Sequence, residues 1–122
     1  MLRQALTLAD GLAHSRERAR LLARAQSGLA AVYRMRGNYR RAQELLRAAL
    51  YGTEHARPPC DLPQWATLLN ELAVTCKYTG DFDEAERLYH RVWAVLVRIG
   101  GPGHPELATV WHNLAGLAHA RR

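Results

Sequence analysis

One segment of this chain occurs twice in full, and its beginning occurs a third time. Residues 27–50, SGLAAVYRMRGNYRRAQELLRAAL, align without gaps with residues 70–93, NELAVTCKYTGDFDEAERLYHRVW. Gly37 and Gly80 are 43 residues apart, and a third copy beginning at Thr109 follows Thr67 by 42 residues. Self-similarity with a period of roughly 20–50 residues indicates stacked repeats, so it constrains the fold more than any other feature.

Each copy is expected to form two helices with a tight turn between them. Leu69, Leu72 and Cys76 recur at helical spacing and form one apolar stripe. Gly80 is expected to end this helix, because a left-handed residue at that position is favourable only without a side chain. Asp81 then begins a capping-box pattern for the next helix.

Two further helix starts are indicated, and no strand is expected. Asp61 and Gln64, with Pro63 between them, form a similar cap, and Pro105 suits the first turn of a later helix. No segment alternates between polar and apolar residues over a useful length. The sequence therefore predicts an all-α, right-handed superhelical stack of about two and a half helical pairs in one domain, residues 1–122.

The repeats predict the boundaries of the helical pairs. Residues 1–14 are assigned to the second helix of a partial preceding repeat, because Leu2 and Leu6 lie one period before Leu45 and Ala49. The remaining assignments are 15–51 for repeat 1, 64–99 for repeat 2 and 105–122 for the first helix of repeat 3. We expect the chain to be a fragment of a longer array; the alternative is that its uncapped terminal helices pair with another copy.

The spacing of these residues resembles that of the tetratricopeptide repeat, of the kinesin-light-chain-like subtype. The first copy meets the family pattern with Gln26, Leu29, Ala30, Tyr33, Gly37, Tyr39, Ala42, Leu46 and Ala49. The second meets it with Leu69, Leu72, Ala73, Cys76, Gly80, Phe82, Ala85, Tyr89 and Val92, and the third with Trp111, Leu114, Ala115 and Ala118. The resemblance implies that these residues face inward and that the first helices of successive repeats line a concave groove that binds peptides.

The resemblance also implies which residues face the groove. One predicted row across the copies is Ser27, Asn70 and His112, and a second row is Arg34, Lys77 and His119. The candidate peptide-binding residues are Arg24, Ser27, Arg34, Thr67, Asn70, Lys77, Tyr78, His112 and His119. Basic side chains beside hydroxyl and amide donors suit carboxylates. We therefore expect a non-enzymatic protein-interaction module that binds an acidic peptide or partner segment; the competing interpretation is that these residues are solvated polar side chains.

Two other functions stay open at this point. The module could serve as a structural or self-associating scaffold, as a homodimer through its terminal helices, or as a regulatory segment of a larger bacterial signalling or transcriptional protein. Nucleic acid binding is less favoured. The net charge is +6, and residues 1–50 hold ten arginines against three acidic residues, but Tyr33 and Tyr39 are assigned to the core and no base-reading motif is present.

The sequence offers little for catalysis, metals or membranes. It contains no glycine-rich phosphate loop, GxSxG or HExxH motif, and we expect no cofactor. His112 and His119 lie two helical turns apart, about 10 Å along the axis, which is too far to hold one ion directly. Cys60 in a proline-rich linker and Cys76 in a helix are not expected to form a disulfide. Without a transmembrane span or signal peptide, we expect a cytoplasmic protein.

Overall fold

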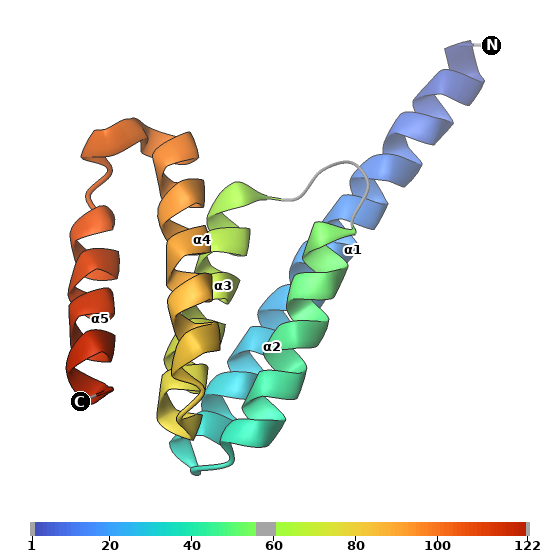
Figure 1. The fold of residues 1–122 in the computed structure, drawn as a ribbon. Coiled ribbons are helices and arrows are strands. Elements are labelled where there is room, and N and C mark those ends of the chain that lie inside the picture. Colours follow the sequence, from blue (N-terminus) through green and yellow to red (C-terminus); the bar gives the residue numbers. More distant parts are fainter. Residues whose placement is uncertain (1, 56–60, 122) are drawn as a thin grey trace.

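The computed structural model describes residues 2–55 and 61–121, which form a row of packed helices (Figure 1). The elements are α1 (Leu2–Met35), α2 (Tyr39–Glu54), α3 (Leu62–Thr79), α4 (Phe82–Gly100), the short 3-10 helix η1 (Gly101–Gly103) and α5 (Leu107–Ala120). The described residues contain no strand, which agrees with the predicted all-α class. Each helix runs antiparallel to the next, as Figure 1 shows. None of the described helices is long and apolar enough to cross a bilayer.

The turns within the two pairs form at the predicted glycines. Gly80 has φ = +84° and Gly37 has φ = +78°, both in the left-handed region. The Asp81 N–H donates to the Cys76 carbonyl at 2.9 Å, and the Gly80 N–H donates to the Lys77 carbonyl at 3.1 Å. These two bonds are those of a Schellman motif, which satisfies the last carbonyls of a helix. The same glycine-dependent turn therefore connects α1 to α2 and α3 to α4.

The predicted helix caps form, but the predicted capping box is only half formed. Asp61 Oδ1 accepts from the Gln64 N–H at 3.1 Å, and Asp81 Oδ1 accepts from the Glu84 N–H at 3.4 Å. A full box also needs the Glu84 side chain to accept from the Asp81 N–H. That N–H is already used by the Schellman turn, and the Glu84 carboxylate instead pairs with Arg87 at 2.7 Å and Arg47 at 3.4 Å. The hydrogen bond from Arg87 holds the pKa of Glu84 below its ordinary value.

The core lies where the helices cross, and small residues occupy the closest approaches. Ala42, Ala73 and Ala85 are completely buried. Alanine at these positions lets the helix backbones approach, because a larger side chain would hold them apart. Cys76 is also buried, and its burial raises the pKa of the thiol to about 11. Cys60, the second cysteine of the chain, lies outside the described residues.

The start of the chain differs from the expectation. The repeat pattern predicts two helices within residues 1–35 with a boundary at 14/15, but α1 is one continuous helix from Leu2 to Met35. The segment around the expected boundary, HSRERARLLA, contains no proline or glycine and is rich in residues that favour helix. Gly11 alone does not interrupt the helix. The first turns of α1 consequently extend away from the other helices (Figure 1).

The inward face predicted for the third repeat is wrong. Trp111 is 67% exposed, Ala115 and Ala118 are exposed, and Leu114 is only partly buried. The residues of α5 that are buried are instead Leu107, Val110 and Leu117. In α3, the positions equivalent to Trp111, Ala115 and Ala118 are Leu69, Ala73 and Cys76, which are completely buried because α3 has a neighbouring helix on both sides. Among the described helices, α5 packs against the preceding helix, α4. It therefore buries the side of its apolar surface that faces α4.

The absence of a neighbouring helix also explains why one predicted core residue of α1 is exposed. Leu29 was expected in the core but is 46% exposed, whereas its equivalent in α3, Leu72, is 1% exposed. Leu72 lies on the α3 face that meets the preceding helix, α2. No preceding helix is present among the described residues to cover the corresponding face of α1. Ala30, which faces α2, is buried as expected.

A candidate peptide-binding groove

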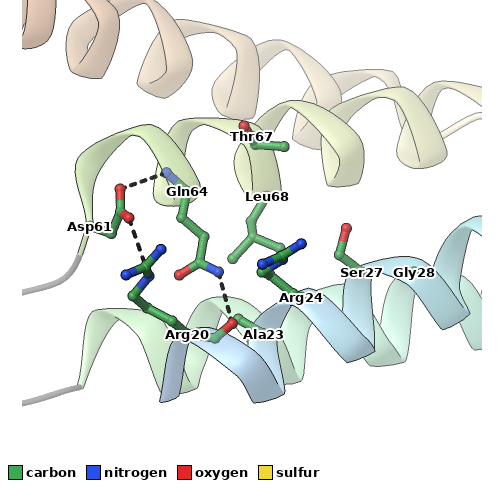
Figure 2. Close-up of a pocket in the computed structure, with 9 residues that line it drawn as sticks. All are labelled: Arg20, Ala23, Arg24, Ser27, Gly28, Asp61, Gln64, Thr67 and Leu68. Atoms are coloured by element: carbon green, nitrogen blue, oxygen red, sulfur yellow. Dashed lines mark hydrogen bonds and ion pairs between the residues drawn. The ribbon is translucent and has the colours of Figure 1, made fainter. Parts of the chain in front are cut away.

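A hollow of about 450 Å³ separates α1 from α3 on one side of the stack (Figure 2). Three of the predicted groove residues, Arg24, Ser27 and Thr67, line it together. The other lining residues are Arg20, Ala23, Gly28, Asp61, Gln64 and Leu68. The sequence-based prediction thus placed residues from two different repeats around one concavity.

Small residues on α1 keep this hollow open. Gly28 has no side chain, and a Cβ added there would meet no atom within 4 Å. Ala23, which lies five residues earlier on the same helix, is buried at the base, and Leu68 contributes an apolar wall from α3. The hollow therefore combines an apolar floor with a polar rim, as peptide and ligand sites commonly do.

Polar contacts close one end of the hollow. Arg20 Nε lies 3.7 Å from Asp61 Oδ2, and Arg20 Nη1 lies 3.4 Å from Glu17 Oε2. Gln64 Nε2 donates to the carbonyl oxygen of Arg20 at 3.1 Å. Figure 2 shows the contacts of Arg20 with Asp61 and Gln64, which bridge the beginning of α3 to α1. They fix the distance between the two helices at this end and neutralise the charge of Arg20.

Arg24 lies one turn further along α1 and differs from Arg20 in its contacts. Its guanidinium forms no ion pair with any side chain in the described part of the chain, although it lines the same hollow. Ser27, one turn further still, donates from Oγ to Glu71 Oε2 at 2.6 Å and so connects α1 to α3. Among the predicted groove donors, Ser27 is therefore engaged internally, whereas the positive charge of Arg24 is available.

A second, smaller hollow of about 160 Å³ adjoins the first. Thr67 lines both hollows, and Asn70 lines only the second. The remaining lining residues come from α3, α4, α5 and the turn before α5: Ala66, Val92, Leu96, Glu106, Thr109 and Val110. The predicted residues Thr67 and Asn70 are thus brought together here, and Thr67 is the residue that the two hollows share.

The other predicted residues lie away from both hollows. Lys77 reaches toward α5, where its Nζ would be 3.6 Å from a Cβ at Gly116. His112 and His119 are exposed on the same face of α5 as Gly116, the residue that Lys77 approaches. Arg34 is half-buried on α1. Tyr78 stacks on Tyr39 with ring centroids 5.3 Å apart, at the turn end of the repeat.

Several residues of the site were not predicted from the sequence, among them Arg20, Gln64 and Glu71. Arg20 and Gln64 line the first hollow, and Glu71 places a carboxylate next to Ser27. The family pattern contains no position for these side chains. One available signal was the position of Gln64 after the capping residue Asp61, because a capping residue's neighbours lie at the end of a helix and reach adjacent elements. The groove consequently holds fixed negative charge as well as positive charge.

Comparisons with known proteins agree with this architecture. Residues 22–56 and residues 66–122 each match a family model described as tetratricopeptide repeat. The crystal structure of BtubC (BKLC) from P. vanneervenii matches with a TM-score of 0.67 at 25% sequence identity, over 93% of this chain and 48% of that chain. The chain therefore spans about half the length of that protein. No curated protein sequence matches the chain.

These matches bear on both the fold and the general role. BtubC (BKLC) is a kinesin-light-chain-like protein built of such repeats, which confirms the subtype predicted from the sequence. Tetratricopeptide repeats generally mediate protein–protein interaction and typically act as non-enzymatic scaffolds. Matches to both helical pairs and to the helix after them, together with the shared fold, show that this chain belongs to the tetratricopeptide-repeat family.

Proposed function

We propose that this chain is a non-enzymatic peptide-binding module whose groove between α1 and α3 takes an acidic segment of a partner protein. The observation that carries the proposal is the position of Arg24, which lines the 450 Å³ hollow without an ion-pair partner in the described residues. A carboxylate that enters the hollow would meet this guanidinium in a partly enclosed site. Such charge-assisted hydrogen bonds are stronger than those between neutral groups.

The rest of the groove supports an extended peptide. Thr67 lines the same hollow as Arg24 and also lines the second hollow, to which Asn70 contributes. The Asn70 side-chain amide can donate to and accept from a peptide backbone. Lys77, next to Gly116 of α5, supplies a second positive charge on the side of His112 and His119. A peptide with acidic residues separated by a few positions would match this distribution.

The negative charges of the groove define what the peptide must avoid. Asp61 and Glu71 are each engaged, the first with Arg20 and the second with Ser27, whereas Glu106 lines the second hollow. A basic residue is therefore tolerated near Glu106 but is repelled beside Arg24. The proposed ligand is consequently a segment with acidic residues at the α1–α3 hollow rather than a uniformly acidic chain.

The test is a binding experiment with acidic peptide libraries on wild-type protein and on Arg24→Glu and Lys77→Glu variants. Loss of one charge-assisted hydrogen bond, about 1.5–3 kcal/mol, corresponds to an affinity loss of about 10- to 100-fold. Arg40→Glu is the matched control, because Arg40 is exposed on α2 and the substitution changes the net charge equally. Affinity that is equal in the Arg24→Glu and Arg40→Glu variants would contradict the proposed site.

The same variants separate peptide binding from nucleic acid binding. A mobility-shift assay with DNA and RNA over a salt series measures how many phosphates the chain contacts. Nucleic acid binding through the arginine-rich half would weaken similarly with Arg24→Glu and Arg40→Glu, because phosphate contacts depend on the general field. Peptide binding at the groove would instead be weakened more by Arg24→Glu than by Arg40→Glu.

A further inference from the structure

The two hollows described above are equivalent sites of successive repeats. The offsets that relate the sequence repeats, 43 residues from α1 to α3 and 42 from α3 to α5, also relate the residues that line them. On one wall, Ala23, Arg24 and Ser27 of the first hollow correspond to Ala66, Thr67 and Asn70 of the second. On the other wall, Gln64, Thr67 and Leu68 correspond to Glu106, Thr109 and Val110. The repeat therefore forms the same kind of hollow twice.

The second hollow has an apolar floor and a polar rim. Its floor consists of residues that are at most 5% exposed: Ala66, Val92, Leu96 and Val110. Its volume of about 160 Å³ is below the roughly 300–1,000 Å³ that is usual for sites of free small molecules. The hollow therefore suits one side chain of a longer ligand better than a free small molecule.

One difference between the equivalent positions frees a negative charge. In the first hollow, Gln64 Nε2 donates to the Arg20 carbonyl at 3.1 Å (Figure 2). In the second, Glu106 takes the position of Gln64, and a carboxylate can only accept. The carbonyl equivalent to that of Arg20 belongs to Pro63, and Thr67 Oγ1 donates to it at 3.0 Å. Glu106 is exposed, and its carboxylate forms no ion pair with any side chain in the described part of the chain.

The positive charge of the first hollow has no equivalent in the second. Thr67 takes the position of Arg24, and its hydroxyl proton is already donated to Pro63. The threonine therefore offers a carboxylate neither a charge nor a free donor. Two equivalent hollows consequently differ in the sign of their available charge, which is positive at Arg24 and negative at Glu106.

We propose that the second hollow binds a lysine or arginine side chain of the same partner segment whose acidic residue binds Arg24, an inference that rests on the proposed function. Thr67, which is exposed and lines both hollows, is the residue over which the segment passes. Successive first helices are separated by at least the roughly 8–10 Å of packed helices, and an extended chain advances about 3.5 Å per residue. The acidic and basic residues are therefore about three or more positions apart, and Glu106 determines the specificity for the basic one.

Fluorescence anisotropy with labelled synthetic peptides tests this inference. Each peptide carries one Glu and, one to five positions away, Lys, Gln or Glu, in both orders and in a neutral Gly/Ser background. Wild type is expected to bind the Glu/Lys peptide about 5-fold more tightly than the Glu/Gln peptide at intervals of three or more, and equally at an interval of one. Glu106→Lys should reverse the preference, so that the Glu/Glu peptide binds more tightly than the Glu/Lys peptide.

The matched control is Glu44→Lys, because Glu44 is exposed on α2, lines neither hollow and undergoes the same change of charge. It should keep the preference of the wild type. Glu106 makes no side-chain cap bond to α5, so its replacement removes no helix cap, and circular dichroism spectra confirm that both variants are folded. A Glu106→Lys variant with the wild-type preference would overturn the inference, as would the same reversal in Glu44→Lys.

The Glu/Gln peptide separates this inference from the proposed function, because it reports on the first hollow alone. Binding of this peptide that is weakened by Arg24→Glu, together with no effect of Glu106→Lys on any peptide, would contradict only the role of the second hollow. Binding of the Glu/Gln peptide that does not depend on Arg24 would contradict the proposed function. Absence of binding of every peptide to the wild type would contradict both.

Discussion

Replacing Gly80 by alanine tests whether the turn of the second pair depends on backbone conformation alone. Gly80 has φ = +84°, and a Cβ added there would meet no atom within 4 Å. The substitution therefore creates no clash with a neighbour. Its only structural cost is to hold an L-residue in the left-handed region, which is about 1–2 kcal/mol.

A matched substitution removes the contribution of the unfolded state. Gly28, in the interior of α1, also has open space around the position of a Cβ, and its φ is not positive. Alanine reduces the conformational entropy of the unfolded chain similarly at both positions. At Gly28 this effect and the better helix propensity of alanine should stabilise the protein by about 0.5–1 kcal/mol. At Gly80 the net change should be a destabilisation of about 0.5–1.5 kcal/mol.

Urea denaturation followed by circular dichroism measures both changes in the free energy of unfolding. The difference between the two variants is the most informative quantity, because the unfolded-state effect largely cancels in it. We expect Gly80→Ala to be less stable than Gly28→Ala by about 1–2 kcal/mol or more. Equal stabilities would refute the assignment of Gly80 to a left-handed turn residue, and with it the common turn geometry of the two pairs.

Three further predictions concern the core, the pH dependence of stability and the contact between α1 and α3. Ala73→Leu should destabilise by about 1–3 kcal/mol in thermal or urea unfolding, because the site is completely buried, whereas Ala94→Leu on the exposed side of α4 should change little. Burial raises the pKa of Cys76 from 9.0 to about 11, so the folded state favours the neutral thiol. The contribution of this thiol to the free energy of unfolding should be fully present below pH 9.0 and be lost as the pH rises toward 11. Unfolding curves recorded across that interval should show this pH dependence in the wild type and not in Cys76→Ala. Ser27→Ala should cost about 1–2 kcal/mol, because it leaves the partly buried Glu71 carboxylate without its donor; a double-mutant cycle with Glu71→Gln that shows no coupling would contradict this.

The order and pairing of the helices could be predicted from the sequence because the repeat encodes them locally. Gly37 and Gly80 end helices through backbone conformation, and Asp61 and Asp81 begin helices through a bond three residues away. These interactions depend only on near neighbours in the chain. The exposure of Trp111 could not be predicted in this way, since burial of one helix face depends on whether another helix lies against it.

The candidate groove was predictable only in part, for a related reason. Helical register places Arg24 and Thr67 on groove-facing positions, and the structure brings both to one hollow. The partners of long side chains do not follow from register. Ser27 was predicted as a free donor, yet it is engaged with Glu71, a residue of another repeat. Which arginine is available, Arg20 or Arg24, likewise depends on the position of Asp61 at the end of α3.

The continuity of α1 has a mechanical consequence for anything attached to its first residues. At 1.5 Å per residue, a helix of 34 residues is about 50 Å long, and it carries orientation as well as distance along its length. A protein fused rigidly to the Leu2 end would be held at a defined azimuth about the helix axis. Removing one residue from the projecting turns would rotate the fused protein by about 100° about the helix axis and bring it about 1.5 Å closer. Deletions there would therefore change the direction of the fused protein far more than its distance.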